Sequence, residues 1–418
     1  MALSYDVLRN RDFRRLLATR LSGIFALQAQ AVIVGWQIYT LTHDPLMLGL
    51  VGLAEAVPAI VFALFAGHIV DKSRPHYIFR NCLLALCMIS LVLLLVAGGL
   101  VGASRPVVIG VIFSGVFLSG LTRSFIMPSS FTLLSQIVPR HDIPAASAWL
   151  SSGFQFAAIT GPAVAGLIYG GYGSTVAWVV PFLSLLVAVI IVSGISAPHR
   201  IFKNHDSREK ALKSIAAGWR FVRHNRVLLP VMALDMFAVL FGGVVAILPV
   251  FADQVLHTGS EGLGLLRAAP AVGSIITALY FAVKPMRVLR GRVLLLVIAG
   301  FGGAMILFGL STEFFTAAFF LALGGAFDSV NMVLRGTLMQ LLIPGEMRGR
   351  VSALSGMFII SSNEIGAFES GLAASLLGLV PSILFGGGMT MLVVGTTALF
   401  ARELRGLAVQ VEKKAVAD

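Results

Sequence analysis

Long apolar stretches, separated by short polar breaks such as Asp44-Pro45 and Pro344-Gly345, divide the chain into segments long enough to cross a membrane. A transmembrane helix needs about 20 mostly apolar residues. No stretch shows the alternating period of a barrel strand. The pattern therefore predicts twelve membrane-spanning helices, six in each half of the chain. The expected spans are 15–41, 46–70, 77–101, 106–137, 144–170, 174–196, 227–254, 261–283, 292–311, 315–342, 350–377 and 381–401.

The two halves of the chain repeat one another. Residues that recur at one constant offset are Thr132 with Thr337, Pro139 with Pro344, Gly161 with Gly366, and Gly166 with Gly371. A second block, beginning at Gly49 and Gly264, repeats in the same chain order. Parallel repeats of this kind are typical of secondary transporters. We expect an all-α membrane protein with two pseudo-symmetric six-helix bundles, 1–197 and 227–418, joined by a linker at 198–226.

Composition agrees with a chain that lies in lipid. Apolar residues make up 57% of the chain and charged residues 12%, against about 25% charged in a soluble domain. Mean hydropathy is +0.93. The two cysteines, Cys82 and Cys87, share one apolar span and form neither a disulfide framework nor a metal-binding spacing. We expect no metal and no cofactor, and a monomer in the bilayer.

The net charge of +12 could suggest nucleic-acid binding, but the basic residues lie in short loops beside apolar spans. Of the 31 Lys and Arg residues, Arg105 alone falls in a loop on one side of the predicted membrane. Arg20, Arg123, Arg267 and Arg335 lie within spans, and all the others fall on the opposite side. This asymmetry predicts an inner-membrane protein with both termini cytoplasmic. The first span lacks a cleavage-type site and is expected to remain.

The linker is basic, and Leu212, Ile215, Trp219 and Val222 fall at helical spacing within it. Two interpretations stay open. The segment is a surface-lying amphipathic helix, or it is a basic linker that simply follows the orientation rule.

Acidic side chains inside the predicted spans are candidates for proton coupling. They are Glu55, Asp235, Asp328, Glu364 and Glu369. An ionised group at the bilayer centre costs about 2.5–3.5 kcal/mol, so each needs a partner or a wet cavity. A carboxylate without a fixed basic partner can bind and release a proton. This favours Asp235 and Glu364, because neither has an obvious basic partner on its own helix.

Polar residues elsewhere in the spans are candidates for a substrate cavity. Asp328, Asn331 and Arg335 share one helical face, and a purely structural Asp328–Arg335 pair is the alternative to a functional role. For Arg123, anion binding and proton transfer both remain open. The first span has no acid and offers Gln28, Gln30 and Trp36.

The loop after the second span resembles a known signature. Gly67, Asp71, Lys72 and Arg74 match the Gly-x-x-x-Asp-Arg/Lys-x-Gly-Arg motif A of the major facilitator superfamily, with Ser73 in place of the usual Gly. The resemblance implies that Asp71 caps a neighbouring helix and pairs with Arg in a breakable latch. A carboxylate at a helix N-terminus beside Arg has the chemistry for such a latch.

Further motifs are similar to exporters of that superfamily. Gly153, Gly161, Pro162 and Gly166 resemble part of motif C of proton-coupled antiporters. The stretch from Met347 to Ala353 is similar to the enterobactin-exporter branch. This resemblance implies alternating-access transport of a small amphiphilic molecule, such as a siderophore, metabolite or drug, in exchange for protons.

The sequence leaves two other functions open and argues against two more. A proton-coupled importer and a lysophospholipid flippase both fit two bundles around a sparsely charged cavity. No Gly-x-x-x-x-Gly-Lys-Ser/Thr loop indicates a primary pump, and no catalytic motif indicates an enzyme.

Overall fold

The computed structural model describes residues 6–196, 217–284 and 288–410. These residues form two compact units, which are described separately. Unit 1 comprises Met1–Arg208 and Val245–Ala268, and unit 2 comprises Glu209–Val244 and Ala269–Asp418.

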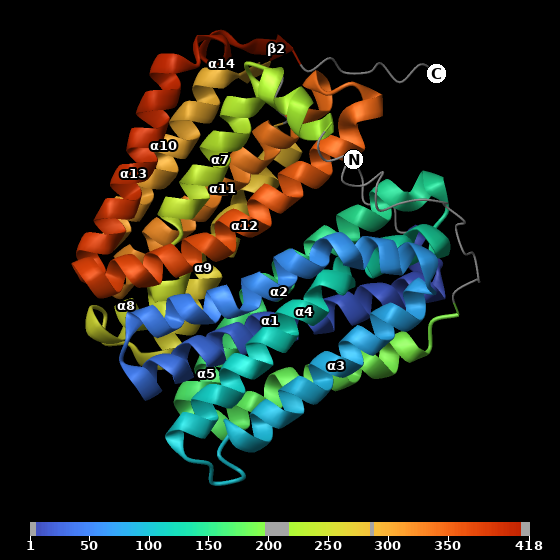
Figure 1. Ribbon diagram of the computed structural model, residues 1–418, viewed down its shortest axis with the longest axis vertical. Coiled ribbons are helices and arrows are strands. Elements are labelled where there is room, and N and C mark those ends of the chain that lie inside the picture. Colours follow the sequence, from blue (N-terminus) through green and yellow to red (C-terminus); the bar gives the residue numbers. More distant parts are fainter. Residues whose placement is uncertain (1–5, 197–216, 285–287, 411–418) are drawn as a thin grey trace. The chain divides into compact units, whose positions relative to one another are not determined.

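Unit 1 is built from long helices that lie side by side (Figure 1). After a short 3-10 turn, η1 (Asp6–Arg9), these are α1 (Arg11–Thr42), α2 (Pro45–Lys72), α3 (Pro75–Val96), α4 (Arg105–Ile137) and, after η2 (Arg140–Asp142), α5 (Ile143–Ser193). η3 (Val245–Ile247), α8 (Leu248–Gln254) and the start of α9 (Gly259–Val283) complete the unit. α1 packs against α5, and α4 packs against both α2 and α3.

Unit 2 repeats this kind of packing with α7 (Leu228–Gly242), the rest of α9, α10 (Gly291–Gly309), α11 (Phe314–Leu342), α12 (Gly345–Leu377) and α13 (Leu379–Phe400). α7 packs against α12 and α13, and α10 packs against α11 and α13. A short antiparallel ribbon pairs β1 (Val288–Arg290) with β2 (Ala408–Gln410), next to α14 (Arg402–Gly406).

Local sequence signals set the helix ends. Asn10 caps α1 by accepting hydrogen bonds from the backbone N–H groups of Asp12 and Phe13, and Asp44 caps α2 by accepting one from the backbone N–H of Leu46. Gly173 has φ of 79° inside α5 and Gly378 has φ of 90° between α12 and α13. Only glycine adopts such angles readily, so these two positions divide neighbouring spans.

Ten of the described helical segments are long and apolar enough to cross a membrane. α5 counts as two spans when it is divided at Gly173, and α12, with 33 residues, is also long enough to cross but more polar. Together these give the twelve spans that the sequence predicts. One expected span differs: residues 227–254 are α7 and α8, interrupted after Gly242 by η3. Gly243 has extended rather than helical backbone angles there, which ends α7.

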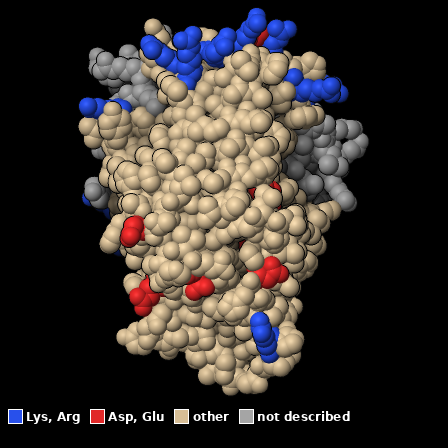
Figure 2. Space-filling view, turned by 90° about the vertical axis from the view of Figure 1, so that its left-hand side faces the viewer, with Lys and Arg blue, Asp and Glu red and all other residues tan. Residues whose placement is uncertain are grey.

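The core of unit 1 lies between α1, α3, α4 and α5 and includes Phe13, Phe79, Leu133 and Leu185. In unit 2, large apolar side chains such as Leu296 on α10 and Phe315 on α11 are exposed, as expected of a surface that faces lipid. Lys and Arg side chains gather at one edge of the visible face, and the broad surface below them carries few charges (Figure 2).

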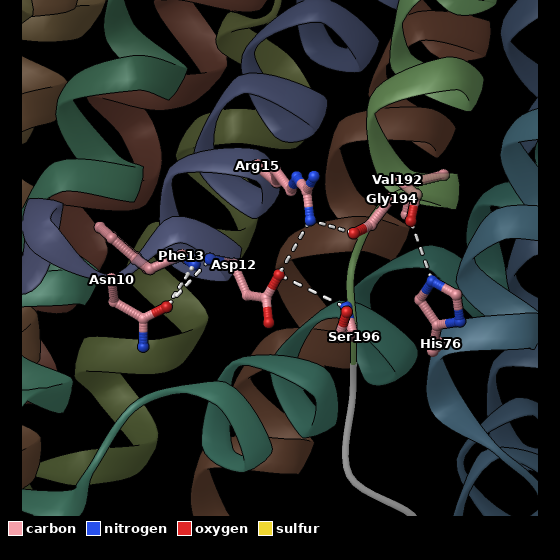
Figure 3. A network of polar contacts seen from close by, with 8 residues as sticks. All are labelled: Asn10, Asp12, Phe13, Arg15, His76, Val192, Gly194 and Ser196. Atoms are coloured by element: carbon pink, nitrogen blue, oxygen red, sulfur yellow. Dashed lines mark hydrogen bonds and ion pairs between the residues drawn. The ribbon is translucent and has the colours of Figure 1, made fainter.

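A polar network holds the end of α5 against the start of α1 (Figure 3). Arg15 donates a hydrogen bond to the backbone carbonyl of Gly194, and Asp12 accepts from both Arg15 and the backbone N–H of Ser196. A His76 ring nitrogen lies 2.9 Å from the carbonyl oxygen of Val192. A cation beside the last carbonyls of a helix satisfies acceptors that the helix itself leaves open.

The predicted amphipathic linker helix falls mostly outside the described residues, and so do Leu212 and Ile215. Residues 217–224 are helical. Val222 is buried in an apolar cluster with Leu228 and Val351, and the Trp219 ring packs edge-on against Phe358 at 6.2 Å.

Candidate functional site

A buried charged cluster lies between α7 and α11 in unit 2. Arg335 Nη1 is 2.7 Å from Asp235 Oδ2, and Asn331 Nδ2 donates to Asp235 Oδ1 at 2.6 Å. Asp235, Asn331 and Arg335 are all buried. Both carboxylate oxygens of Asp235 are therefore occupied by donors from one face of α11.

The structure corrects one interpretation of this cluster. The ion pair of Arg335 joins it to Asp235 on another helix, not to Asp328 on its own helix. Asp235 consequently has a fixed basic partner, which the sequence could not show because that partner lies 100 positions away in the chain. Helical spacing did place Asn331 and Arg335 on one face, as the structure has them.

Asp328 is the additional acid of the cluster. It lies one turn before Asn331 on α11, near Asp235 and Arg335. Two carboxylates and one guanidinium leave one negative charge when both acids are ionised. One bound proton makes the group neutral, and an apolar surrounding favours that neutral state.

The other candidate acids are not part of this cluster, and they lie on α2 and α12. Glu55 on α2 pairs with Arg123 on α4 in unit 1. Glu364 and Glu369 lie on α12 of unit 2, and both are partly exposed.

A cavity of about 200 Å³ opens in unit 1 between α1, α3, α4 and α5. Its polar lining consists of Thr19, Arg20 and Gln28 on α1 and Arg123 on α4. Phe79 and Phe154 are among its apolar lining residues. The sequence had identified Gln28 and Arg123 as cavity candidates.

The remaining candidates of the first span have other surroundings. Gln30 and Trp36 are buried, and neither is among the described lining residues of this cavity. The Trp36 ring lies 6.2 Å from that of Tyr39. The hydroxyl of Tyr39 donates to Asp253 on α8 at 2.8 Å and accepts from Gln254 at 3.2 Å. Sequence reasoning missed this contact, whose only signal was an acid at the end of an apolar span.

The motif C glycines allow helices of unit 1 to approach closely. A Cβ at Gly161 would lie 2.9 Å from the carbonyl oxygen of Phe25 on α1. A Cβ at Gly166 would lie 2.7 Å from the Cα of Gly264 on α9. Pro162 also takes part, because its carbonyl oxygen would lie 2.6 Å from a Cβ at Gly264. Gly153 is less confined, with Leu21 as its nearest neighbour at 3.5 Å.

The motif A latch stays a prediction. Gly67, Asp71 and Lys72 lie in α2, but the side chains of Asp71 and Lys72 are outside the described part of the structure. Arg74 is exposed, and its guanidinium lies 5.7 Å from the centre of the Tyr77 ring.

Comparison with known proteins identifies the family. The family described as transmembrane secretion effector, of the major facilitator superfamily, matches residues 2–414. The enterobactin exporter EntS of Escherichia coli O1:K1 is 24% identical over 394 residues, which cover 93% of this chain and 91% of that protein. EntS of Shigella boydii serotype 4 matches to the same extent.

Solved structures agree on the fold. The xylose transporter XylE of E. coli superposes with a TM-score of 0.68 at 12% identity, covering 96% of this chain and 98% of that one. A bacterial homologue of the lysosomal transporter Spinster gives 0.66 at 16% identity, covering 94% and 96%. This multi-pass membrane chain belongs to the transmembrane secretion effector family of major facilitator superfamily transporters.

Proposed function

We propose that the chain is a proton-coupled exporter of a small amphiphilic molecule in a bacterial inner membrane. The observation that carries this proposal is the charge balance of the Asp235–Asn331–Arg335 cluster with Asp328. Asp235 is fully compensated by its two donors, so Asp328 is the group that gains or loses a proton.

Protonation can drive alternating access only if it changes the relative stability of the two end states. The cluster joins α7 to α11, so a shift of α7 relative to α11 alters the distance from Asp235 to both Asp328 and Arg335. A proton on Asp328 removes its repulsion of Asp235 and its attraction to Arg335 together. The cluster therefore has the components of a proton-sensitive contact between two helices.

The direction of transport is inferred from relatives. The curated proteins that this chain resembles are named as exporters of enterobactin, and the family is described by secretion. The motif C glycines add a second argument for export, since the resemblance that identified them is to antiporters. An importer and a lysophospholipid flippase remain as outcomes of the experiment.

Everted membrane vesicles that contain the chain test this proposal. With the vesicle interior acidified, so that the proton gradient drives protons outward, we expect one cargo of a panel of enterobactin, ethidium and lysophosphatidylethanolamine to accumulate inside the vesicles. A protonophore should abolish that accumulation, and so should Asp328→Asn, whereas Asp6→Asn on the exposed η1 turn should not. Accumulation of the lysolipid alone, without need of a proton gradient, would assign a flippase instead. Export of cargo out of everted vesicles would assign an importer.

A further inference from the structure

The two arginines that line the cavity in unit 1 carry more positive charge than the acidic side chains paired with them balance. Arg20 takes part in no ion pair among the described residues. Its guanidinium donates to Ser130 Oγ at 2.9 Å and approaches Met127 Sδ at 3.7 Å, and both partners are neutral. Arg123 is balanced by Glu55, so the three groups together hold one uncompensated positive charge.

A second, independent feature lies in the same cavity wall. Thr19 lines the cavity and is fully buried, yet its hydroxyl has no hydrogen-bond partner in the described structure. Leaving a buried hydroxyl without a hydrogen-bond partner is unfavourable. Thr19 immediately precedes Arg20, so an unsatisfied hydroxyl and an uncompensated guanidinium occur together on α1.

The rest of the lining is apolar and aromatic. Phe79 on α3 is buried, whereas Phe154 on α5 is about half exposed. The cavity volume is about 200 Å³. That space fits a head group and a short apolar segment, and it is smaller than the 300–1,000 Å³ of pockets that enclose whole drug-sized ligands.

From these features we propose that the cavity binds the acidic head group of an amphiphile that carries one negative charge beside an aromatic or aliphatic body. Arg20 supplies the charge and a fork of N–H donors that matches a carboxylate. Thr19 supplies its free hydroxyl, and Arg123 adds a second donor when the ligand approaches the Glu55 pair. This inference deepens the proposed export function by naming the chemistry of the cargo, but it concerns binding and does not require proton coupling.

Two related probes test the head group. The purified chain, in nanodiscs of zwitterionic lipid, is titrated with 4-phenylbutanoate and with its alcohol, 4-phenylbutan-1-ol, while thermal unfolding is followed by intrinsic fluorescence. We expect saturable stabilisation by the acid and none by the alcohol at equal concentration. Equal stabilisation by both probes, or by neither, would overturn the proposal.

Variants assign the residues. Arg20→Gln should weaken the affinity for the acid at least tenfold, and Thr19→Val should weaken it by a smaller factor. Arg105→Gln is a matched control, because Arg105 is exposed at the start of α4 and does not line the cavity. If Arg20→Gln fails to fold, Arg20→Lys keeps the charge and should retain part of the affinity. Unchanged binding by both Thr19→Val and a folded Arg20 variant would contradict the assignment.

An acidic lipid presents the same chemistry as a free amphiphile, and a third arm separates these sources. Nanodiscs with phosphatidylglycerol are compared with purely zwitterionic ones. Competition that raises the apparent Kd for 4-phenylbutanoate in wild type, but not in Arg20→Gln, would identify the lipid head group as an occupant. Unaltered affinity would identify a free amphiphile. If binding holds while proton-driven accumulation fails, the export proposal falls and this site stands.

Discussion

At the scale of single residues, Asp235 and Arg335 form a buried ion pair between α7 and α11. Replacing one partner, as in Arg335→Leu, leaves an uncompensated buried carboxylate and should destabilise the protein by about 3–5 kcal/mol. The double variant Asp235→Leu/Arg335→Leu should lose less than the sum of the two single variants. Denaturant unfolding in detergent measures all three.

The exposed Arg226–Glu403 ion pair supplies the control for these Asp235 and Arg335 variants. Its side chains are 81% and 51% exposed, so Arg226→Leu should change stability by at most about 1 kcal/mol. A stability loss in Arg335→Leu no larger than that in Arg226→Leu would contradict the buried ion pair.

Tyr39 provides a second residue-scale prediction. Tyr39→Phe removes a hydrogen bond to the carboxylate of Asp253 and should cost about 1.5–3 kcal/mol, the range for bonds to charged groups. Thermal unfolding checks the loss. Tyr172→Phe is the control, because Tyr172 is 73% exposed and should be neutral. Equal melting temperatures for the two variants would show that the Tyr39 contact contributes nothing.

Residue partners were the least predictable feature from the sequence. Helical spacing correctly put Asn331 and Arg335 on one face, because that periodicity is local. It could not reveal that Asp235 faces them or that Glu55 faces Arg123, since both pairings depend on which helices pack together. Arg20 had a usable signal: a cation in a span that contains no acid.

At the scale of helices, close approach depends on glycine at particular crossings. Gly166→Leu would drive a side chain into the backbone of α9 at Gly264 and should cost about 1–3 kcal/mol or more. Gly110→Leu in α4 is the matched control, because a Cβ at Gly110 meets no atom within 4 Å. Melting temperatures of the two variants measure the difference. A Gly166 variant as stable as the Gly110 variant would rule out a tight α5–α9 contact.

Helix ends and spans were largely predictable because their causes are local. Apolar length, the Asp44-Pro45 start and the Gly173 break are all visible in the sequence. The interruption between α7 and α8 was not predicted, since the apolar run continues across it. Gly242-Gly243 and Pro249 are the local signals there, and both glycine and proline are also frequent within membrane helices.

At the scale of the whole molecule, the distribution of Lys and Arg predicts the orientation of the chain. In a variant with Cys82→Ala and Cys87→Ala, Ser104→Cys should react with an impermeant maleimide added outside intact cells. Ser73→Cys should react only after permeabilisation. The opposite pattern would place both termini outside the cytoplasm and contradict the orientation.

The central claim is that Asp328, beside the compensated Asp235–Arg335 pair, carries the transported proton. The most direct measurement uses pyranine-loaded proteoliposomes and the cargo that accumulates in everted vesicles. Adding that cargo should move protons in wild type. In Asp328→Asn the proton signal should vanish while cargo exchange down its own gradient persists. Undiminished proton movement in Asp328→Asn would contradict the account.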